Sequence, residues 1–256
     1  GLTFGLSMRY LGVALGQSVA LGTTAALGTL IPAMLTGDLF TTKGLILLLA
    51  VAVTLVGITL VGFAGSLRSK NMTEEEKKKA IKDFALKKGL LIALLSGIMS
   101  ACFNLGLNAG LPIREAVVSG GASDLFAQNP VTLLVTMGGF ITNLIYCLYM
   151  NYKNKTGGEI RHSSKQVLIN NLLFCALAGL LWYSQFFGLG MGQSFFEPDS
   201  VMMAFSWSIL MSLNVVFSNV WGIILKEWVG AGKKAITFLV LGMIILIISL
   251  IIPNLF

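Results

Sequence analysis

The chain has 256 residues, of which 55% are hydrophobic and only 11% are charged, and it carries a formal net charge of +7. Soluble domains usually carry about 25% charged residues, so this composition excludes a soluble globular fold and indicates a protein surrounded by lipid. The Lys and Arg residues lie in short runs between apolar segments and form no patch with interleaved aromatic residues. The basic charge therefore indicates membrane topology, and we expect no nucleic-acid partner.

Apolar windows long enough to cross a bilayer, which takes about 20 residues, predict an all-α fold built as a polytopic membrane helix bundle. Eight spans are expected, at 1–16, 18–36, 43–67, 88–110, 130–152, 167–192, 200–226 and 233–252. The first of these is short. The chain also begins at Gly1 without a Met, so we expect the true N-terminus to lie further upstream.

Basic residues alternate between the predicted loops. The segments 68–88, 153–166 and 226–234 hold fifteen of the eighteen Lys and Arg residues, whereas the intervening loops hold only Lys43 and Arg114. Because Lys and Arg are retained on the cytoplasmic side of a membrane, the three basic loops are expected to be cytoplasmic. Both ends of the chain would then face outward.

The longest basic loop divides the chain into three parts. Residues 1–67 would form three helices, residues 68–87 a charged cytoplasmic linker, and residues 88–256 five helices. Within the linker, Thr73 and Glu76 match a capping box, which predicts a short surface helix.

A short internal similarity indicates how these helices are related. Gly12–Ser18 and Gly188–Ser194 are identical at four of seven positions, and the loop charges make the first copy run inward and the second outward. Two similar halves of opposite orientation are typical of transporters whose site lies near the bilayer midplane. If helices one to three correspond to helices six to eight, helices four and five lack counterparts, and two helices would precede Gly1.

The predicted helix at 88–110 carries polar side chains four residues apart, which places them on one face. They are Ser96, Ser100, Asn104 and Asn108. Such groups are costly to expose to lipid, so this face is expected to contact other helices or a wet cavity. Two interpretations stay open: the row forms interhelical hydrogen bonds, or the amides of Asn104 and Asn108, which offer donors and acceptors, bind the hydroxyls of a sugar.

Other predicted helices combine aromatic and amide side chains. Trp207 and Asn214 share one face of the helix at 200–226. An indole ring packs on the apolar C–H face of a sugar while an amide bonds its hydroxyls, although a Trp near a span end is more often an interfacial anchor. Further candidates of the same kind are Asn143, Trp182, Tyr183 and Gln185.

No carboxylate lies in the middle of a predicted span. Glu115 and Glu227 lie at span ends, where ionisable groups are usually solvated or paired. Arg9 is placed about two turns inside the first predicted span, and snorkelling toward the cytoplasmic surface is its default interpretation. The single His162 falls in a basic loop, and the sequence has no metal-ligand spacing and no hydrolase motif. We therefore expect no catalytic residue, no metal and no cofactor.

Five segments, taken in their order along the chain, carry a resemblance to a known family. They are Gly5–Gly12, Lys88–Gly110, Gly138–Asn143, Trp182–Phe187 and Leu225–Trp228. Together they resemble the L-rhamnose–proton symporter family of the drug/metabolite transporter superfamily. The resemblance implies ten helices in two inverted halves, both termini outside, and proton-driven uptake of L-rhamnose across the bacterial inner membrane.

The resemblance also implies roles for particular residues. Sugar contacts would come from Asn104, Asn108, Asn143, Trp182, Tyr183 and Gln185, to which the polar–aromatic face adds Trp207 and Asn214. Glu115, Glu227 and Arg9 are the candidates for proton coupling or gating, with the proton as the coupling ion. The segment 194–200, with Glu197, Pro198 and Asp199, departs from the family pattern and leaves the identity of the sugar open.

Two other functions stay open. One is transport of another small metabolite, because the superfamily fold hosts many substrates. The other is a membrane sugar sensor that does not transport, although a static receptor has no need of two oppositely oriented halves. The expected partners are a small sugar and the lipid bilayer, and the sequence predicts no oligomeric state.

Overall fold

A computed structural model describes residues 1–71 and 85–255 of the chain. Every regular element in these residues is an α-helix or a 3-10 helix, so the predicted all-α class is confirmed over the described part. The expected capping box at 73–76 and most of the predicted linker at 68–87 lie outside the described residues. The chain forms two compact units, Gly1–Asn108 with Phe196–Phe256, and Ala109–Phe195.

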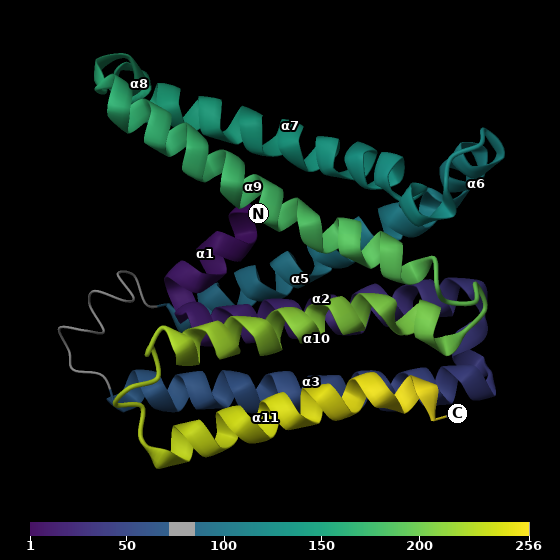
Figure 1. The fold of residues 1–256 in the computed structure, drawn as a ribbon. Coiled ribbons are helices and arrows are strands. Elements are labelled where there is room, and N and C mark those ends of the chain that lie inside the picture. Colours follow the sequence, from purple (N-terminus) through teal and green to yellow (C-terminus); the bar gives the residue numbers. More distant parts are fainter. Residues whose placement is uncertain (72–84, 256) are drawn as a thin grey trace. The chain divides into compact units, whose positions relative to one another are not determined.

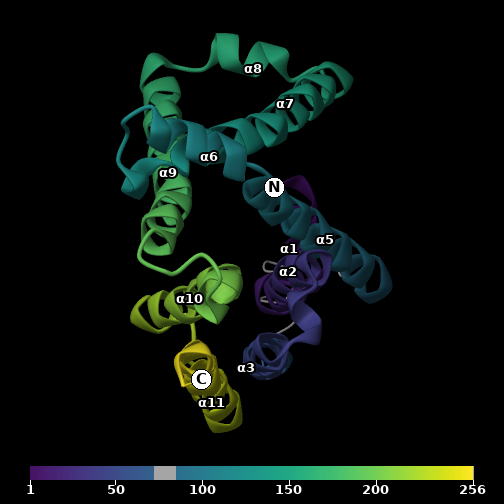
Figure 2. The ribbon, with the colours of Figure 1, turned by 90° about the vertical axis from the view of Figure 1, so that its right-hand side faces the viewer.

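The first unit contains most of the helices. They are α1 (Leu2–Leu11), α2 (Val13–Thr36), η1 (Asp38–Phe40), α3 (Thr42–Asn71), α5 (Leu86–Ala109), α10 (Val201–Ile224), α11 (Lys233–Ile251) and η3 (Ile252–Asn254), and Figures 1 and 2 show them from two sides. Local chemistry explains some of the boundaries. The Ser200 hydroxyl accepts a hydrogen bond from the Met203 amide at 3.1 Å, which satisfies one of the free N–H groups at the start of α10. α2 ends at Gly37, whose φ of 83° lies in the left-handed region.

Seven helical stretches of the described residues are long and apolar enough to cross a membrane, one fewer than predicted. They are Leu15–Thr36, Thr42–Asn71, Lys87–Ser119, Asp124–Asn154, Lys165–Gln193, Val201–Ile224 and Lys233–Asn254. The predicted helix at 1–16 is not among them, because a break at Gly12 separates α1 from α2. Gly12 ends α1, since its φ of 81° and ψ of 160° lie outside the helical region.

Small residues permit close contact between α3 and α11, which lie side by side in the first unit (Figure 1). A Cβ added at Gly57 would lie 2.7 Å from Leu246 Cγ, and one added at Gly242 would lie 2.9 Å from the Gly57 carbonyl oxygen. Between the same two helices, the Thr54 hydroxyl donates to Ser249 Oγ at 3.0 Å. Close backbone approach and an interhelical hydrogen bond therefore hold this pair, as is common in membrane bundles.

An apolar cluster joins α2, α3, α10 and η3. Its buried members are Ala33, Leu47, Ala50, Val51, Phe205 and Ile252. Phe205, the member of this cluster from α10, is 0% exposed. Because lipid tails are as apolar as these side chains, the shape fit and dispersion contacts between the helices stabilise the cluster more than the exclusion of water does.

The second unit contains α6 (Leu111–Ser119), η2 (Asp124–Phe126), α7 (Asn129–Asn154), α8 (Gly157–His162) and α9 (Lys165–Gln193). The Ser164 hydroxyl caps α9 by accepting a hydrogen bond from the Val167 amide at 3.4 Å. α8 connects α7 to α9 (Figure 1). Most of the large apolar side chains on α7 and α9 are exposed, which leaves these helices with faces for lipid or for other helices.

Candidate functional site

Pro32 lies inside α2 and leaves one carbonyl of that helix without its usual donor. In an α-helix, each N–H bonds the carbonyl four residues earlier, so the carbonyl concerned is that of Gly28. Proline has no N–H to give it. A buried polar group without a partner costs about 1–3 kcal/mol. In membrane proteins such freed carbonyls are satisfied by neighbouring helices.

Asn104 of α5 supplies the missing donor. Its Nδ2 donates to the Gly28 carbonyl oxygen at 2.7 Å, and Asn104 is only 6% exposed. Ser96, on the same face of α5, is buried as well. Interhelical hydrogen bonding, one of the two interpretations left open for this polar row, therefore describes the contact that Asn104 makes. Its second amide hydrogen and its Oδ1 form no hydrogen bond with any described residue.

Trp207 of α10 lies against the same glycine. A Cβ added at Gly28 would overlap the Trp207 indole at Nε1 and Cδ1, so the lack of a side chain there makes room for the ring. Phe103 of α5 stacks on Trp207, with the ring centroids 6.3 Å apart. Gly28 is thus the point where α2, α5 and α10 meet. Two predicted site residues, Asn104 and Trp207, come together there.

Two fully buried serines lie one turn apart on α10, beside this point. The Ser208 hydroxyl donates to the Ala25 carbonyl oxygen at 3.1 Å, and the Thr29 hydroxyl lies 2.7 Å from Ser208 Oγ. The Ser212 hydroxyl has no hydrogen-bond partner among the described residues. On this face of α10, the Ser208 hydroxyl is therefore hydrogen-bonded to α2, whereas the Ser212 hydroxyl is not hydrogen-bonded to any described residue.

Glu227, a predicted coupling or gating residue, pairs with a basic side chain of α3. Arg68 Nη1 lies 3.9 Å from Glu227 Oε2, and the Arg68 guanidinium lies 5.3 Å from the centroid of the Trp228 ring. Close by in the chain, Asn71 Nδ2 donates to the Ala231 carbonyl oxygen at 2.8 Å. These contacts connect the end of α3 to the segment between α10 and α11. The Glu227 side chain is 53% exposed, so it is both paired and solvated.

Three further candidates of the first unit lie elsewhere on its helices. Asn108, near the end of α5, is exposed, and Asn214 of α10 is partly buried. Arg9 is exposed and lies in the last turn of α1. Arg9 was predicted about two turns inside the first helix, and it lies nearer the helix end because α1 ends at Leu11. A cationic side chain in a last helical turn is stabilised by the negative end of the helix dipole.

The candidates of the second unit lie on α7 and α9, and most of them are partly buried. Asn143 of α7 is partly buried, and its Nδ2 donates to the Gly139 carbonyl of its own helix at 2.7 Å. On α9, Gln185 Nε2 donates to the Trp182 carbonyl oxygen at 2.9 Å. Trp182 is 49% exposed, and Tyr183 is partly buried. Trp182 and Gln185 are thus adjacent on one helix, whereas Asn143 comes from another.

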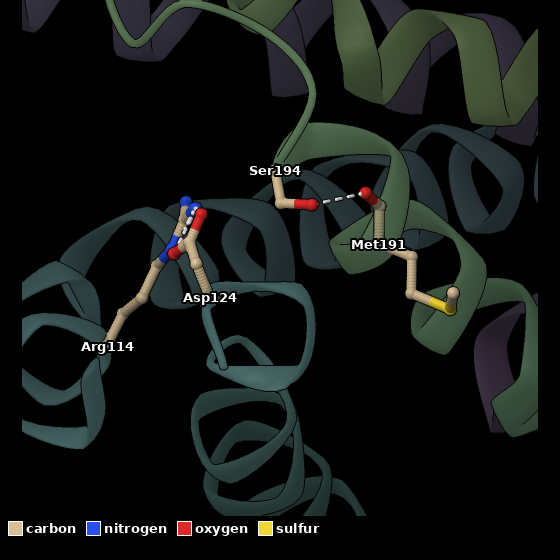
Figure 3. A network of polar contacts seen from close by, with 4 residues as sticks. All are labelled: Arg114, Asp124, Met191 and Ser194. Carbon is tan, nitrogen blue, oxygen red and sulfur yellow. Dashed lines mark hydrogen bonds and ion pairs between the residues drawn. The ribbon is translucent and has the colours of Figure 1, made fainter. Parts of the chain in front are cut away.

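Glu115 is exposed on α6, and its neighbour Arg114 forms an ion pair with Asp124 of η2. Arg114 Nη2 donates to both carboxylate oxygens of Asp124, at 3.0 and 3.1 Å. Figure 3 shows this pair, together with Ser194, whose hydroxyl donates to the Met191 carbonyl oxygen at 2.8 Å at the end of α9. This bidentate ion pair links α6 to η2. Its basic member, Arg114, is one of the two basic residues that were predicted to lie in the intervening loops.

Sequence reasoning missed the acceptor at Gly28, although one signal for it is present. Pro32 stands inside an apolar helix, and counting back four residues identifies the Gly28 carbonyl as a group that needs another donor. The donor itself carries no such signal, because Asn104 lies 76 positions away in the chain. Asp124 was missed as well, since a carboxylate in a short loop resembles any solvated charge until its partner is known.

The sequence is similar to known proteins over almost its whole length. Residues 1–255 match the family model described as L-rhamnose-proton symport protein (RhaT). The chain is 35% identical over 254 residues to an L-rhamnose-proton symporter of Yersinia pestis, and 36% identical over 256 residues to one of Klebsiella pneumoniae. Both alignments cover 97% of this chain and 72% of the relative. No solved structure gives a significant match.

Proposed function

Because the chain belongs to the L-rhamnose-proton symport protein family, we propose that it carries L-rhamnose, or a related deoxysugar, into the cell together with protons. The observation that carries this proposal is the family match, which extends over residues 1–255. The proton is the coupling ion. The family performs transport and not covalent catalysis, so the side chains are considered as binding, gating or coupling groups.

The sugar site is proposed to include Asn104 and Trp207. Both are buried and both lie against Gly28, which supports a shared role. An amide offers donors and acceptors to hydroxyl groups, and an indole ring offers a flat apolar surface to the C–H face of a sugar. The other proposed contacts, from further helix faces, are Asn108, Asn143, Trp182, Tyr183, Gln185 and Asn214.

Glu227 is proposed to take part in proton coupling or gating, with Glu115 and Arg9 as further candidates. Its pairing with Arg68 at 3.9 Å supports this role. Protonation removes the negative charge of a carboxylate and with it the attraction to a guanidinium. A proton that binds Glu227 would therefore loosen the connection between the end of α3 and the segment that follows α10.

The helices are proposed to belong to a ten-span fold with two inverted halves in the bacterial inner membrane. The similarity between Gly12–Ser18 and Gly188–Ser194 supports the inverted relation, with residues 1–67 in one half and 88–256 in the other. The distribution of Lys and Arg supports a cytoplasmic position for the three basic loops, which places the end of α11 outside. The outward position predicted for Gly1 belongs to the same proposal.

The experiment that tests this function is uptake of labelled L-rhamnose into proteoliposomes that contain the purified protein. An inward proton gradient should drive accumulation of the sugar, and a protonophore should abolish it. Addition of L-rhamnose without a gradient should acidify the interior, which a trapped pH dye reports. Liposomes without protein are the control.

Three results would contradict parts of the proposal. Uptake that ignores the proton gradient would exclude symport. Uptake of a different solute from a panel of deoxysugars and small metabolites, in place of L-rhamnose, would assign the chain another substrate on the same fold. Binding of L-rhamnose without uptake would indicate a sensor.

A further inference from the structure

The Gly28 carbonyl differs from other carbonyls inside the spans in the kind of donor that it has. A carbonyl within an α-helix normally bonds a backbone N–H, which leaves only when the helix unwinds. Pro32 has no N–H, and the donor to Gly28 is the side-chain amide of Asn104 on another helix. A side-chain amide moves away by rotation about its χ angles, without any change in the backbone. The Gly28 carbonyl is therefore an acceptor whose donor is exchangeable.

A sugar hydroxyl suits such an exchange because it both donates and accepts hydrogen bonds. Inserted between the two groups, it would donate to the Gly28 carbonyl and accept from Asn104 Nδ2, which lie 2.7 Å apart in this structure. Neither group would then lose its hydrogen bond. A solute with only acceptors would leave the carbonyl unsatisfied, and a cation would leave the amide unsatisfied. The chemistry at this point thus favours a polyhydroxylated substrate.

The surroundings of Gly28 fit the same ligand class. The lack of a side chain at Gly28 lets the Trp207 indole lie directly against the α2 backbone, where a Cβ would overlap the ring. The ring of Trp207, with Phe103 stacked on it, places an aromatic surface beside the carbonyl. Helices interrupted by Gly or Pro commonly line the substrate sites of secondary transporters.

We propose that the Gly28 carbonyl is an acceptor of the sugar site, opened by Pro32 and held by Asn104 when no sugar is bound. The proposal rests on the proposed function. It adds Gly28 as a residue that contacts the substrate through its main chain, and Pro32 as a positioning residue that acts through Gly28. A sugar hydroxyl takes the place of the Asn104 amide when substrate binds.

A cycle that combines one substitution with altered sugars tests the exchange. Pro32→Ala gives residue 32 an N–H, so the Gly28 carbonyl acquires a permanent backbone donor. Binding of L-rhamnose and of its monodeoxy analogues to the purified protein is measured by calorimetry. In the unaltered protein, one analogue should bind about 2- to 10-fold more weakly than L-rhamnose, the effect of one net hydrogen bond. In Pro32→Ala, this penalty should fall to less than about 2-fold, because the carbonyl no longer depends on the hydroxyl.

The matched control is Pro130→Ala. Pro130 lies in the first turn of α7, where a helix has no bond for its N–H to make, so the analogue penalties should equal those of the unaltered protein. Equal penalties in Pro32→Ala and the unaltered protein, for every analogue, would show that no sugar hydroxyl reaches Gly28 and would overturn the proposal.

Thermal unfolding tests the premise separately from sugar binding. Asn104→Ala should lower the unfolding temperature, and adding Pro32→Ala should restore it, because the new N–H replaces the lost amide. A double variant no more stable than Asn104→Ala would overturn the coupling of Pro32 to Asn104. If the unaltered protein does not bind L-rhamnose, both the proposed function and the sugar role of Gly28 are contradicted. The unfolding comparison does not depend on sugar binding, and it still tests whether Asn104 replaces the donor that Pro32 lacks.

Discussion

Arg68, in the last turn of α3, forms an ion pair with Glu227 in the segment between α10 and α11, with Nη1 3.9 Å from Oε2. Their side chains are 29% and 53% exposed. Exposed ion pairs contribute about 0–1 kcal/mol to stability, because water screens the charges and ordering two long side chains costs entropy. This pair is therefore too weak to hold the fold together, and it can break and re-form during a transport cycle.

Glu227→Gln separates a coupling role from a structural one. The substitution keeps the shape of the side chain and removes its charge, so the free energy of unfolding should change by less than about 1 kcal/mol. If protonation of Glu227 takes part in coupling, the initial rate of L-rhamnose uptake should lose its dependence on external pH. Uptake in proteoliposomes across a pH series measures this. Glu159→Gln, an exposed carboxylate on α8, is the control and should keep the normal profile. An unchanged profile in Glu227→Gln would remove Glu227 from proton coupling.

Two serine-to-alanine substitutions on α10 should have different effects on stability. Ser208→Ala removes the partner of Thr29, a buried hydroxyl that is only 1% exposed, and should lower the free energy of unfolding by about 1–3 kcal/mol. Ser212→Ala removes a hydroxyl that has no partner among the described residues, so it should be neutral or stabilising. Unfolding of both variants in the same detergent compares them directly. A larger loss in Ser212→Ala than in Ser208→Ala would show that Ser212 has a partner under those conditions.

Gly57→Ala should separate α3 from α11. The added Cβ would lie 2.7 Å from Leu246 Cγ and 3.1 Å from the Gly242 carbonyl oxygen, so the helices must move apart. Such overpacking typically costs about 1–3 kcal/mol. Gly179→Ala on α9 is the control, because no atom lies within 4 Å of its added Cβ. That substitution should be neutral or should stabilise the helix by up to about 1 kcal/mol, the difference in helix propensity. Thermal unfolding of the two variants tests the contrast, which would be absent if α3 and α11 did not pack at these glycines.

Span positions were largely predictable because length and apolarity are local properties of the chain. The predicted helix at 233–252 corresponds to α11, Lys233–Ile251, and the one at 200–226 to α10, Val201–Ile224. The first span was not predictable in the same way. Gly12 can continue a membrane helix, and its φ of 81° accompanies the packing of α1 on α2, where a Cβ at Gly16 would lie 2.8 Å from the Ser7 carbonyl oxygen. That contact is tertiary and leaves no periodic pattern.

The candidate site was predictable in residue type but not in arrangement. The polar row of the helix at 88–110 correctly indicated a face turned toward other helices over Ser96 and Asn104, both of which are buried. The row did not continue to Asn108, which is exposed. Periodicity identifies a face of a helix, but burial at each turn depends on how far the neighbouring helix extends. The partner of Asn104, the Gly28 carbonyl, follows from Pro32 and from the fold together.

Asn104→Ala and Asn143→Ala should differ in stability although both remove an amide from a predicted sugar contact. Asn104→Ala leaves the Gly28 carbonyl without its donor in a buried place, and the free energy of unfolding should fall by about 1–3 kcal/mol. Asn143 is partly buried and donates to the Gly139 carbonyl, which also accepts from the backbone N–H of Asn143 in the helix. Removal of the Asn143 amide should change the free energy of unfolding by less than about 0.5 kcal/mol, because the Gly139 carbonyl keeps its backbone donor. If Asn143 contacts the sugar, Asn143→Ala should raise the KM for L-rhamnose while the protein unfolds at its normal temperature. An unchanged KM would show that Asn143 does not contact the sugar. Because the variant unfolds at its normal temperature, a loss of folded protein cannot account for the result.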